Sequence, residues 1–104
     1  MKPSLDYAFA ALAHPIRREI LGRLAESSAR ATDLVRPFGI TQQAISKHLT
    51  VLMRAGLVRQ QKRGEEQWCA LDSRPLVEAT GWIETHRKVW GSRLDWLAEL
   101  VEEP

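Results

Sequence analysis

Cysteine and long hydrophobic runs are what this 104-residue sequence has least of. Its single cysteine, Cys69, has no partner for an internal disulfide and cannot by itself build a thiolate metal cluster. We expect a small buried strand residue, and redox sensing is the alternative left open. No apolar run approaches the roughly 20 residues of a membrane-spanning helix, and the N-terminus lacks the apolar stretch of a signal peptide. The sequence therefore predicts a cytoplasmic protein with no membrane partner.

Catalytic and cofactor-binding motifs are also missing. The sequence shows no Ser/His/Asp order, no glycine-rich phosphate loop and no paired inward carboxylates, so an enzyme would lack both a nucleophile and a cofactor cradle. We expect no enzymatic activity, no catalytic residues and no cofactor. With 44% hydrophobic and 27% charged residues, the composition is that of a folded protein, and the length predicts a single domain over residues 1–104.

Acidic residues are absent from the middle of the chain, where none occurs from Thr41 to Gly64. Residues 1–63 hold 11 Lys and Arg against 4 Asp and Glu, whereas residues 64–104 hold 4 against 9, although the net charge of the chain is only +2. Solubility does not require such a depletion, but it is expected where phosphates approach. The charge distribution therefore makes nucleic acid the leading candidate partner.

Apolar spacing predicts helices through the first part of the chain. A short helix is followed by a second one that restarts at Pro15, because proline suits the first turn of a helix. We expect Thr32 to be the N-cap of a short helical segment over residues 33–36, with Pro37 and Gly39 making a tight break after it.

A helix-turn-helix followed by a hairpin is predicted next. Thr41 caps a helix over residues 41–55, and Gly56 stands where a left-handed C-terminal cap is favoured. The short helix, the tight turn and this second helix form a helix-turn-helix pattern. Strands over 58–63 and 66–71 then surround a two-residue turn that begins with glycine, which suits type II′. The hairpin, residues 58–71, is in the place of a wing.

The helix over 41–55 has one face without large apolar residues. Its apolar stripe consists of Ile45, Leu49, Leu52 and Met53. The opposite face carries Gln43, Lys47, Thr50 and Arg54, with Gln42 and Ser46 at the border. Amide side chains reach adenine edges, Lys and Arg reach guanine or phosphate, and Ser and Thr serve either base or backbone. Any surface helix needs a polar face for solvation, but the lack of acidic residues and the basic hairpin favour DNA.

The predicted DNA-binding residues follow from this face and from the hairpin. They are Gln42, Gln43, Ser46, Lys47, His48, Thr50 and Arg54 on the helix, and Lys62 and Arg63 on the wing. The N-terminal part of the second helix of a helix-turn-helix contacts bases in the major groove. Arg17, Arg18 and Arg36 are further candidates for phosphate contacts. For His48, packing is an alternative to a phosphate contact.

A long C-terminal helix is predicted from about residue 75 to 102, capped by Asp72 or Ser73. Its apolar residues include Ile83, Trp90 and Leu97, each seven positions apart. About 28 residues rise roughly 42 Å, which is more than a small domain can cover. Part of this helix should therefore face a partner, and a second copy of the chain is the partner that we expect.

The segment TQQAISKHLTVLMRAGLV resembles the recognition-helix segment of the ArsR/SmtB family of bacterial winged-helix transcriptional regulators. That family shows a Ser or Thr cap, then S-[KR]-H-L, then L-x-x-A-G-L-V. The opening FAALAHPIRREILGRLAE is similar to the first two helices of the family, and the resemblance covers essentially the whole chain. It implies a mainly α fold with a small β-hairpin, a winged helix-turn-helix of about five helices and a two-stranded wing. It also implies a repressor that binds a pseudo-palindromic operator in double-stranded DNA.

The resemblance further implies a homodimer made by the first and last helices. The interface residues expected on these helices are Leu5, Phe9, Ile83, Trp90, Leu94 and Leu97. Members of the family that sense metals place paired Cys on the third helix, or His and carboxylates on the last. Residues 32–38 contain no Cys and the last helix offers only His86, so we expect no metal site. A site shared across the dimer by His86 and Glu99 is left open.

The alternative interpretation is a winged-helix module that binds another protein through its Trp-rich last helix. Salt distinguishes the two, because DNA binding weakens steeply as salt rises, whereas docking through tryptophans barely responds. The sequence does not identify the operator, the regulated genes or the inducing signal.

Overall fold

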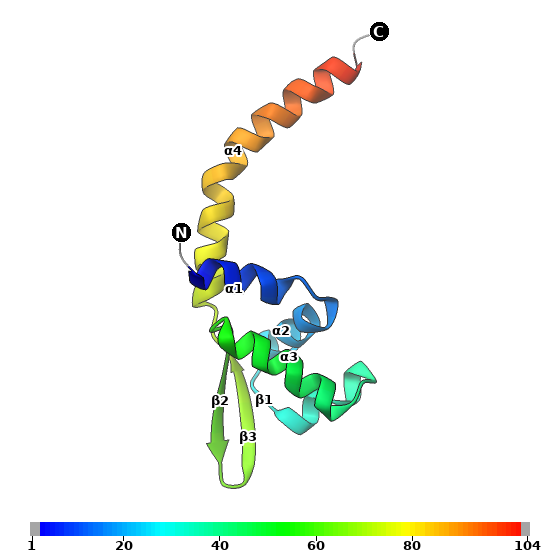
Figure 1. Cartoon of the computed structure of the whole chain (residues 1–104), viewed down its shortest axis with the longest axis vertical. Helices are drawn as coiled ribbons and strands as arrows, with labels where there is room; N and C mark the ends of the chain where they lie inside the picture. The colour runs from blue at the N-terminus through cyan, green and yellow to red at the C-terminus, as the bar shows by residue number, and fades with distance from the viewer. Residues whose placement is uncertain (1–2, 103–104) are drawn as a thin grey trace.

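The computed structural model describes the backbone of residues 3–102 and the side chains of residues 5–91 and 99–101. The predicted interface residues Leu94 and Leu97 lie outside the described side chains. Figure 1 shows a compact body, made of the short helices and a small sheet, and one long helix that projects from it. The elements in chain order are α1 (Pro3–Leu12), α2 (Pro15–Glu26), β1 (Ala29–Arg30), η1 (Ala31–Leu34), η2 (Arg36–Phe38), α3 (Gln42–Arg54), β2 (Val58–Arg63), β3 (Glu66–Leu71) and α4 (Arg74–Glu102).

Side chains cap the start of three helices. The Oγ1 of Thr41 accepts a hydrogen bond from the N–H of Ala44 (3.1 Å), as predicted for α3. Asp72, rather than Ser73, provides the side-chain acceptor for α4, since its Oδ1 accepts from the N–H of Arg74 (3.1 Å). At α2 the cap is His14, one of the roles expected for a histidine at this helix junction, and its Nδ1 accepts from the N–H of Ile16 (3.1 Å). Each acceptor satisfies one of the unpaired N–H groups of a helix start.

The prediction that Thr32 caps a helix over 33–36 is wrong. That region forms two 3-10 turns, η1 and η2, and Thr32 lies inside the first of them. The reason is that Ala29 and Arg30 pair with β3 as a short strand, so the turn begins directly after them. Pro37 lies within η2, and Gly39 ends η2 with a positive φ of 63°.

The predicted wing is confirmed with its bounds, β2 and β3. The strands pair antiparallel from Val58 opposite Leu71 to Arg63 opposite Glu66, and β1 pairs on the other side of β3. Gly64 at the turn has φ 64°, and no non-glycine residue of the described backbone has a positive φ. A positive φ at the first turn residue alone fits type II′ and excludes type I′.

The end of α3 is joined rigidly to the wing. Gly56 has φ 74°, the N–H of Gly56 donates to the C=O of Met53, and the N–H of Leu57 donates to the C=O of Leu52, each at 3.0 Å. These two bonds are a Schellman motif, which the predicted left-handed cap favours. Leu57 is fully buried, so α3 and β2 share one core. The other fully buried large side chains are Ile20, Leu34, Ile45, Leu49, Leu52 and Cys69.

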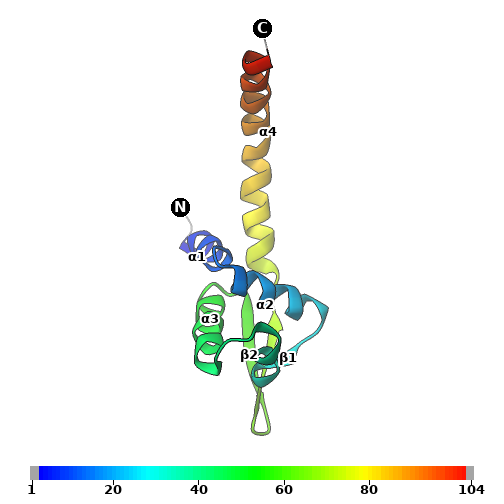
Figure 2. The ribbon, with the colours of Figure 1, turned by 90° about the vertical axis from the view of Figure 1, so that its right-hand side faces the viewer.

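The long helix α4 leaves most of the surface of its described side chains uncovered. The molecule measures 65 × 30 × 21 Å with a radius of gyration of 17.9 Å, against about 13 Å for a compact chain of this length. Figure 2 shows α4 extending away from α1 and α2. Ala79 is buried and Leu76 packs against the core, but Ile83 and Trp90 on the same stripe are 40% and 46% exposed. Within the described residues, no helix is both long and apolar enough to cross a membrane.

Candidate nucleic-acid interface

The polar face of α3 points away from the core. The buried stripe consists of Ile45, Leu49 and Leu52. The side chains of α3 that are predicted to bind DNA are all exposed, except that of His48. Gln42, Gln43, Ser46 and Lys47 line one shallow hollow. The structure therefore brings these four side chains together on the N-terminal half of α3, on one surface open to solvent.

Thr50 has an internal partner. Its Oγ1 lies 2.9 Å from the C=O of Ser46 and donates a hydrogen bond to it. The hydroxyl proton is therefore used within the helix, while the lone pairs of the oxygen can still accept from a ligand.

His48 faces the body of the protein more than its neighbours do. It is half-buried, and its ring centroid lies 4.4 Å from that of His14. Its Nδ1 lies 3.3 Å from Nη1 of Arg17. Burial, His14 and Arg17 together lower the pKa of His48. Packing is therefore what the structure shows for His48, and a contact with DNA stays a prediction.

Arg17 and Arg18 bind the end of α1. Arg17 donates from Nε to the C=O of Ala11 (2.7 Å) and from Nη2 to the C=O of Ala10 (3.0 Å), and Arg18 donates to the C=O of Leu12 (2.6 Å). Basic groups at a helix C-terminus satisfy its last carbonyls. Sequence reasoning missed this role, because it depends on how the chain turns between α1 and α2. Arg36 is exposed and stays a candidate for a phosphate contact.

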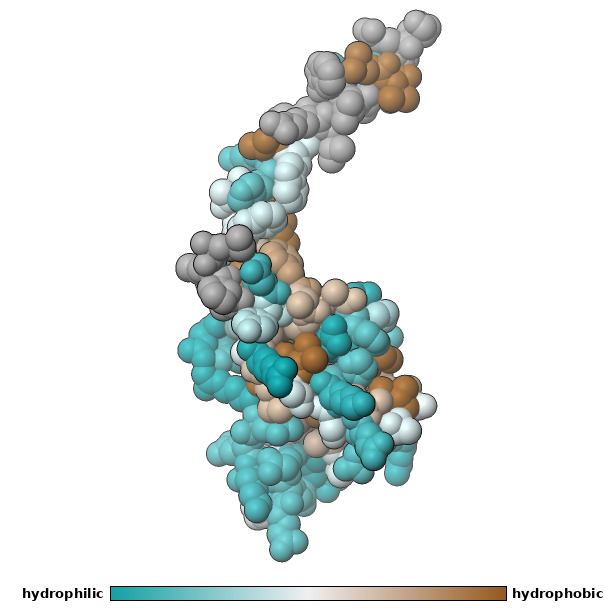
Figure 3. Space-filling view, in the orientation of Figure 1, coloured by the Kyte–Doolittle hydropathy of each residue, from teal (hydrophilic) through white to brown (hydrophobic). Residues whose placement is uncertain are grey.

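The wing presents a hydrophilic surface. Every residue of β2 after Val58 is exposed, including Lys62 and Arg63. The guanidinium of Arg63 lies over the ring of Trp68, 5.0 Å from its centroid, which is a cation–π geometry. Figure 3 shows hydrophilic side chains over the lower part of the molecule, where the wing projects. Lys62 and Arg63 are therefore open to a polyanion.

Two other arginines at the wing are paired with carboxylates. Arg30 contacts Asp33 at 2.8 Å and reaches Glu66 of the wing at 3.3 Å. Arg59, at the start of the wing, contacts Asp72 at 3.0 Å. Glu66 is close to the turn of the wing, so Arg30 offsets a negative charge there. The pairs of Arg30 with Glu66 and of Arg59 with Asp72 could not be read from the sequence, because their members lie in elements that only the fold brings together.

Cys69 is a buried residue of β3, as expected. Its Sγ accepts a hydrogen bond from Nε2 of Gln60 (3.6 Å). Burial raises the pKa of the Cys69 thiol, which is opposite to the lowered pKa of a reactive cysteine. The thiol is therefore protonated near neutral pH and covered.

No group of three potential ligands among His, Cys, Asp and Glu is placed to hold a metal ion within the described part of the chain. His86 stacks on Trp82 with centroids 4.3 Å apart, and its Nδ1 lies 2.8 Å from the C=O of Trp82. The described contacts of His86 are thus aromatic and backbone ones. A site shared with Glu99 of a second copy stays untested.

Comparisons with known proteins find a helix-turn-helix family and relatives that are transcriptional regulators. A helix-turn-helix domain family matches residues 12–61. The chain is 28% identical over 79 residues to the transcriptional repressor SdpR of Bacillus subtilis, covering 76% of this chain and 88% of that protein. It is 31% identical to the HTH-type transcriptional regulator Rv2034 of Mycobacterium tuberculosis, covering 95% and 90%.

Similarity extends to solved structures. The crystal structure of an ArsR family transcriptional regulator matches with a TM-score of 0.80 and 32% identity, covering 88% of this chain and 96% of that one. The resemblance seen in the recognition-helix segment and the predicted winged fold are both confirmed. The chain therefore belongs to the ArsR family of DNA-binding transcriptional regulators with a winged helix-turn-helix fold.

Proposed function

We propose that the chain is a homodimeric repressor of a pseudo-palindromic operator. In this proposal α3 enters the major groove and the wing contacts the backbone or the minor groove. The observation that carries it is the exposed, acid-free face formed by Gln42, Gln43, Ser46 and Lys47. Helix-turn-helix proteins read bases with this part of their second helix.

The roles of the side chains follow from their chemistry. Gln42 and Gln43 can pair bidentately with adenine, and Lys47 can reach guanine or phosphate. Arg54 lies at the far end of α3 and suits a backbone contact, as Lys62 and Arg63 do on the wing. The relative named as a transcriptional repressor supports repression over activation.

The dimer is supported by the uncovered surface of α4. Exposed Ile83 and Trp90 continue the stripe in which Ala79 is buried and Leu76 is partly buried against the core. Phe9 of α1 packs against Trp82 with ring centroids 5.8 Å apart, which adds α1 to the same apolar surface. A two-fold dimer would place two copies of α3 about 34 Å apart, in successive major grooves.

The test is DNA binding by Lys47→Ala and Gln43→Ala at several salt concentrations. Binding sites are first selected from a pool of random duplexes with the unmodified protein. Lys47→Ala should weaken binding to all sequences and reduce the salt slope by about one if Lys47 contacts a phosphate. Gln43→Ala should relax discrimination at one base position by about 1–3 kcal/mol.

Lys88→Ala is the matched control, because it removes the same side chain from α4, away from α3. If Lys47→Ala and Lys88→Ala bind with equal affinity and equal salt slope, and Gln43→Ala keeps its base preference, α3 is not the recognition helix. If the unmodified protein selects no DNA even at low salt, with and without added Zn²⁺, the protein-docking alternative becomes the better interpretation.

A further inference from the structure

Asp72 lies where the wing meets α4. It directly follows β3, and Arg74, two residues later, begins α4. Its backbone N–H donates to the C=O of Leu57 (2.8 Å), which ties this connection to the start of the wing. The covalent connection between the wing and the long helix therefore passes through this residue.

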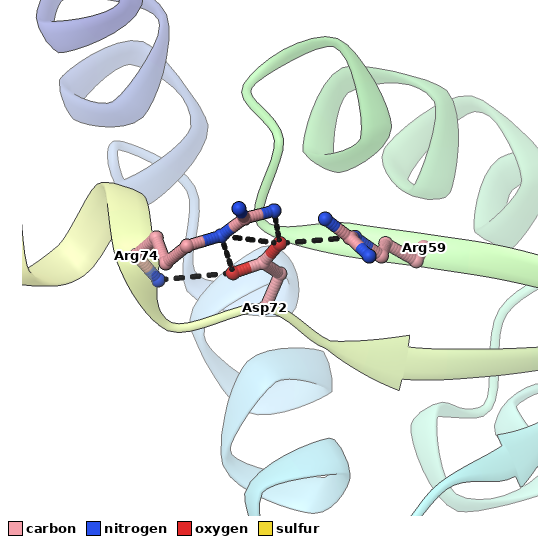
Figure 4. Close-up of polar contacts among 3 residues, drawn as sticks. All are labelled: Arg59, Asp72 and Arg74. Atoms are coloured by element: carbon pink, nitrogen blue, oxygen red, sulfur yellow. Dashed lines mark hydrogen bonds and ion pairs between the residues drawn. The ribbon is translucent and has the colours of Figure 1, made fainter.

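The carboxylate of Asp72 joins two arginines from different elements. Its Oδ2 lies 3.0 Å from Nε of Arg59 on β2 and 2.6 Å from Nη2 of Arg74 on α4. Oδ1 also accepts from Nε and from the backbone N–H of Arg74, at 3.0 and 3.1 Å. Figure 4 shows the carboxylate between the two guanidinium groups. One side chain thus connects the wing to the first residue of the helix.

Burial separates this cluster from an ordinary surface ion pair. The side chain of Asp72 is 11% exposed, whereas those of Arg59 and Arg74 are 66% and 74% exposed. The hydrogen bonds from Arg74, together with the charges of both arginines, lower the pKa of Asp72. Isolated exposed ion pairs contribute little to the free energy of unfolding. Here, however, one largely buried carboxylate caps α4 and binds arginines from two elements.

Because Asp72 lies at the start of α4, a small change there alters the direction of the whole helix. The described contacts of α4 with the body lie in its first turns, at Leu76, at Ala79 and where Trp82 meets Phe9. The helix has 29 residues, so it is about 43 Å long. A change of about 10° in the direction of its axis at Arg74 therefore moves its far end by about 7 Å. In a dimer formed through α4, such a change alters the separation of the two wings.

We propose that Asp72 is a positioning residue for DNA recognition. By joining Arg59 to Arg74 it sets the angle between the wing and α4, and so the spacing between half-sites that the dimer accepts. This inference rests on the proposed function, namely a dimer that binds two half-sites.

The experiment measures affinity as a function of half-site spacing. An operator selected with the unmodified protein is rebuilt with its half-sites moved together or apart by one or two base pairs, and a single half-site is added. Each added base pair shifts and rotates one half-site by about 3.4 Å and 35°. The unmodified protein should therefore lose about tenfold or more in affinity away from its best spacing. With Asp72→Ala or the milder Asp72→Asn the preference should flatten to within about threefold, while single half-site affinity stays within about twofold.

Two further variants complete the design. Arg74→Gln leaves Asp72 and its bond from the backbone N–H of residue 74 in place, and it removes the guanidinium from the joint. Because the side chain of Arg74 is 74% exposed, this variant keeps the test possible if Asp72 variants do not fold. Glu84→Gln removes a carboxylate from α4 whose partner is Arg87, and it should keep the full spacing preference.

The outcomes separate the two levels of the proposal. Failure of the unmodified protein to distinguish spacings would count against two-site binding, and so against the proposed function. The role of Asp72 would be overturned if the variants keep the steep preference for one half-site spacing, that is, if Arg74→Gln keeps it together with Asp72→Ala or Asp72→Asn. An equal loss at every spacing and at the single half-site would overturn it as well, because that is what a purely structural role produces.

Discussion

His14 and His48 lie side by side where α2 and α3 approach each other, and the Nδ1 of each ring is an acceptor. Nδ1 of His14 accepts from the N–H of Ile16 (3.1 Å), and Nδ1 of His48 faces a guanidinium nitrogen of Arg17 at 3.3 Å. Arginine can only donate, so the Nδ1 of His48 must accept. A proton on the Nδ1 of His48 removes this acceptor and places a positive charge beside Arg17.

Stability should therefore fall in mild acid. The pKa of His48 is lowered below its ordinary value of 6.5 in the folded chain, so the unfolded chain takes up the proton first. The free energy of unfolding should be at its full value above pH 6.5 and decrease as the pH falls from there toward the lowered pKa. Urea unfolding of the unmodified protein and His48→Gln across this range measures the effect. An identical pH dependence in the two proteins would contradict it.

At the scale of elements, the junction of α3 and β2 depends on the backbone conformation of one residue. Gly56 has φ 74°, and a Cβ added there would lie 3.5 Å from Cγ of Pro75. Gly56→Ala should therefore lower the free energy of unfolding by about 1–2 kcal/mol. Gly22→Ala is the matched control, since nothing lies within 4 Å of its added Cβ, and inside α2 it should stabilise by about 0.5–1 kcal/mol. Equal effects in thermal and urea unfolding would exclude backbone strain at Gly56.

Elements with local signals were predictable, and those made by distant pairing were not. Thr41, Pro15, Gly56 and the Gly64 turn each act within a few residues, so the sequence showed where α3, α2 and the wing begin or end. The strand β1 has only two residues and depends on β3, so no periodicity could reveal it. Without β1, the segment before α3 was misread as a capped helix.

The same division applies to the candidate interface. The outward direction of Gln43, Lys47 and Arg54 follows from helical periodicity alone. The contacts of His48 with Arg17 and of Asp72 with Arg59 join residues 31 and 13 positions apart, and their geometry needs the complete fold.

At the scale of the whole molecule, α4 carries the surface that a second copy should cover. Trp90 is 46% exposed, and its described ring contacts are with Trp82 and His86 of the same helix. Trp90→Ala should therefore raise the dimer dissociation constant by about thirtyfold, equivalent to about 2 kcal/mol, without unfolding the body. Val77→Ala, which removes an exposed apolar side chain from the opposite side of α4, should leave association unchanged. Sedimentation velocity over a concentration series measures both, and equal constants would show that the stripe is not the interface.

The distribution of tryptophan gives the molecule two separate optical reporters. Trp82, Trp90 and Trp96 belong to α4, whereas Trp68 belongs to the wing. Trp68 lies beneath the guanidinium of Arg63, so any anion that draws Arg63 away changes the surroundings of that one indole. The emission of a chain that keeps only Trp68 would follow the wing, and that of a chain that keeps only Trp90 would follow the long helix. The first variant would thus report on the approach of DNA to the wing, and the second on the association of two copies through α4, each by the fluorescence of one tryptophan.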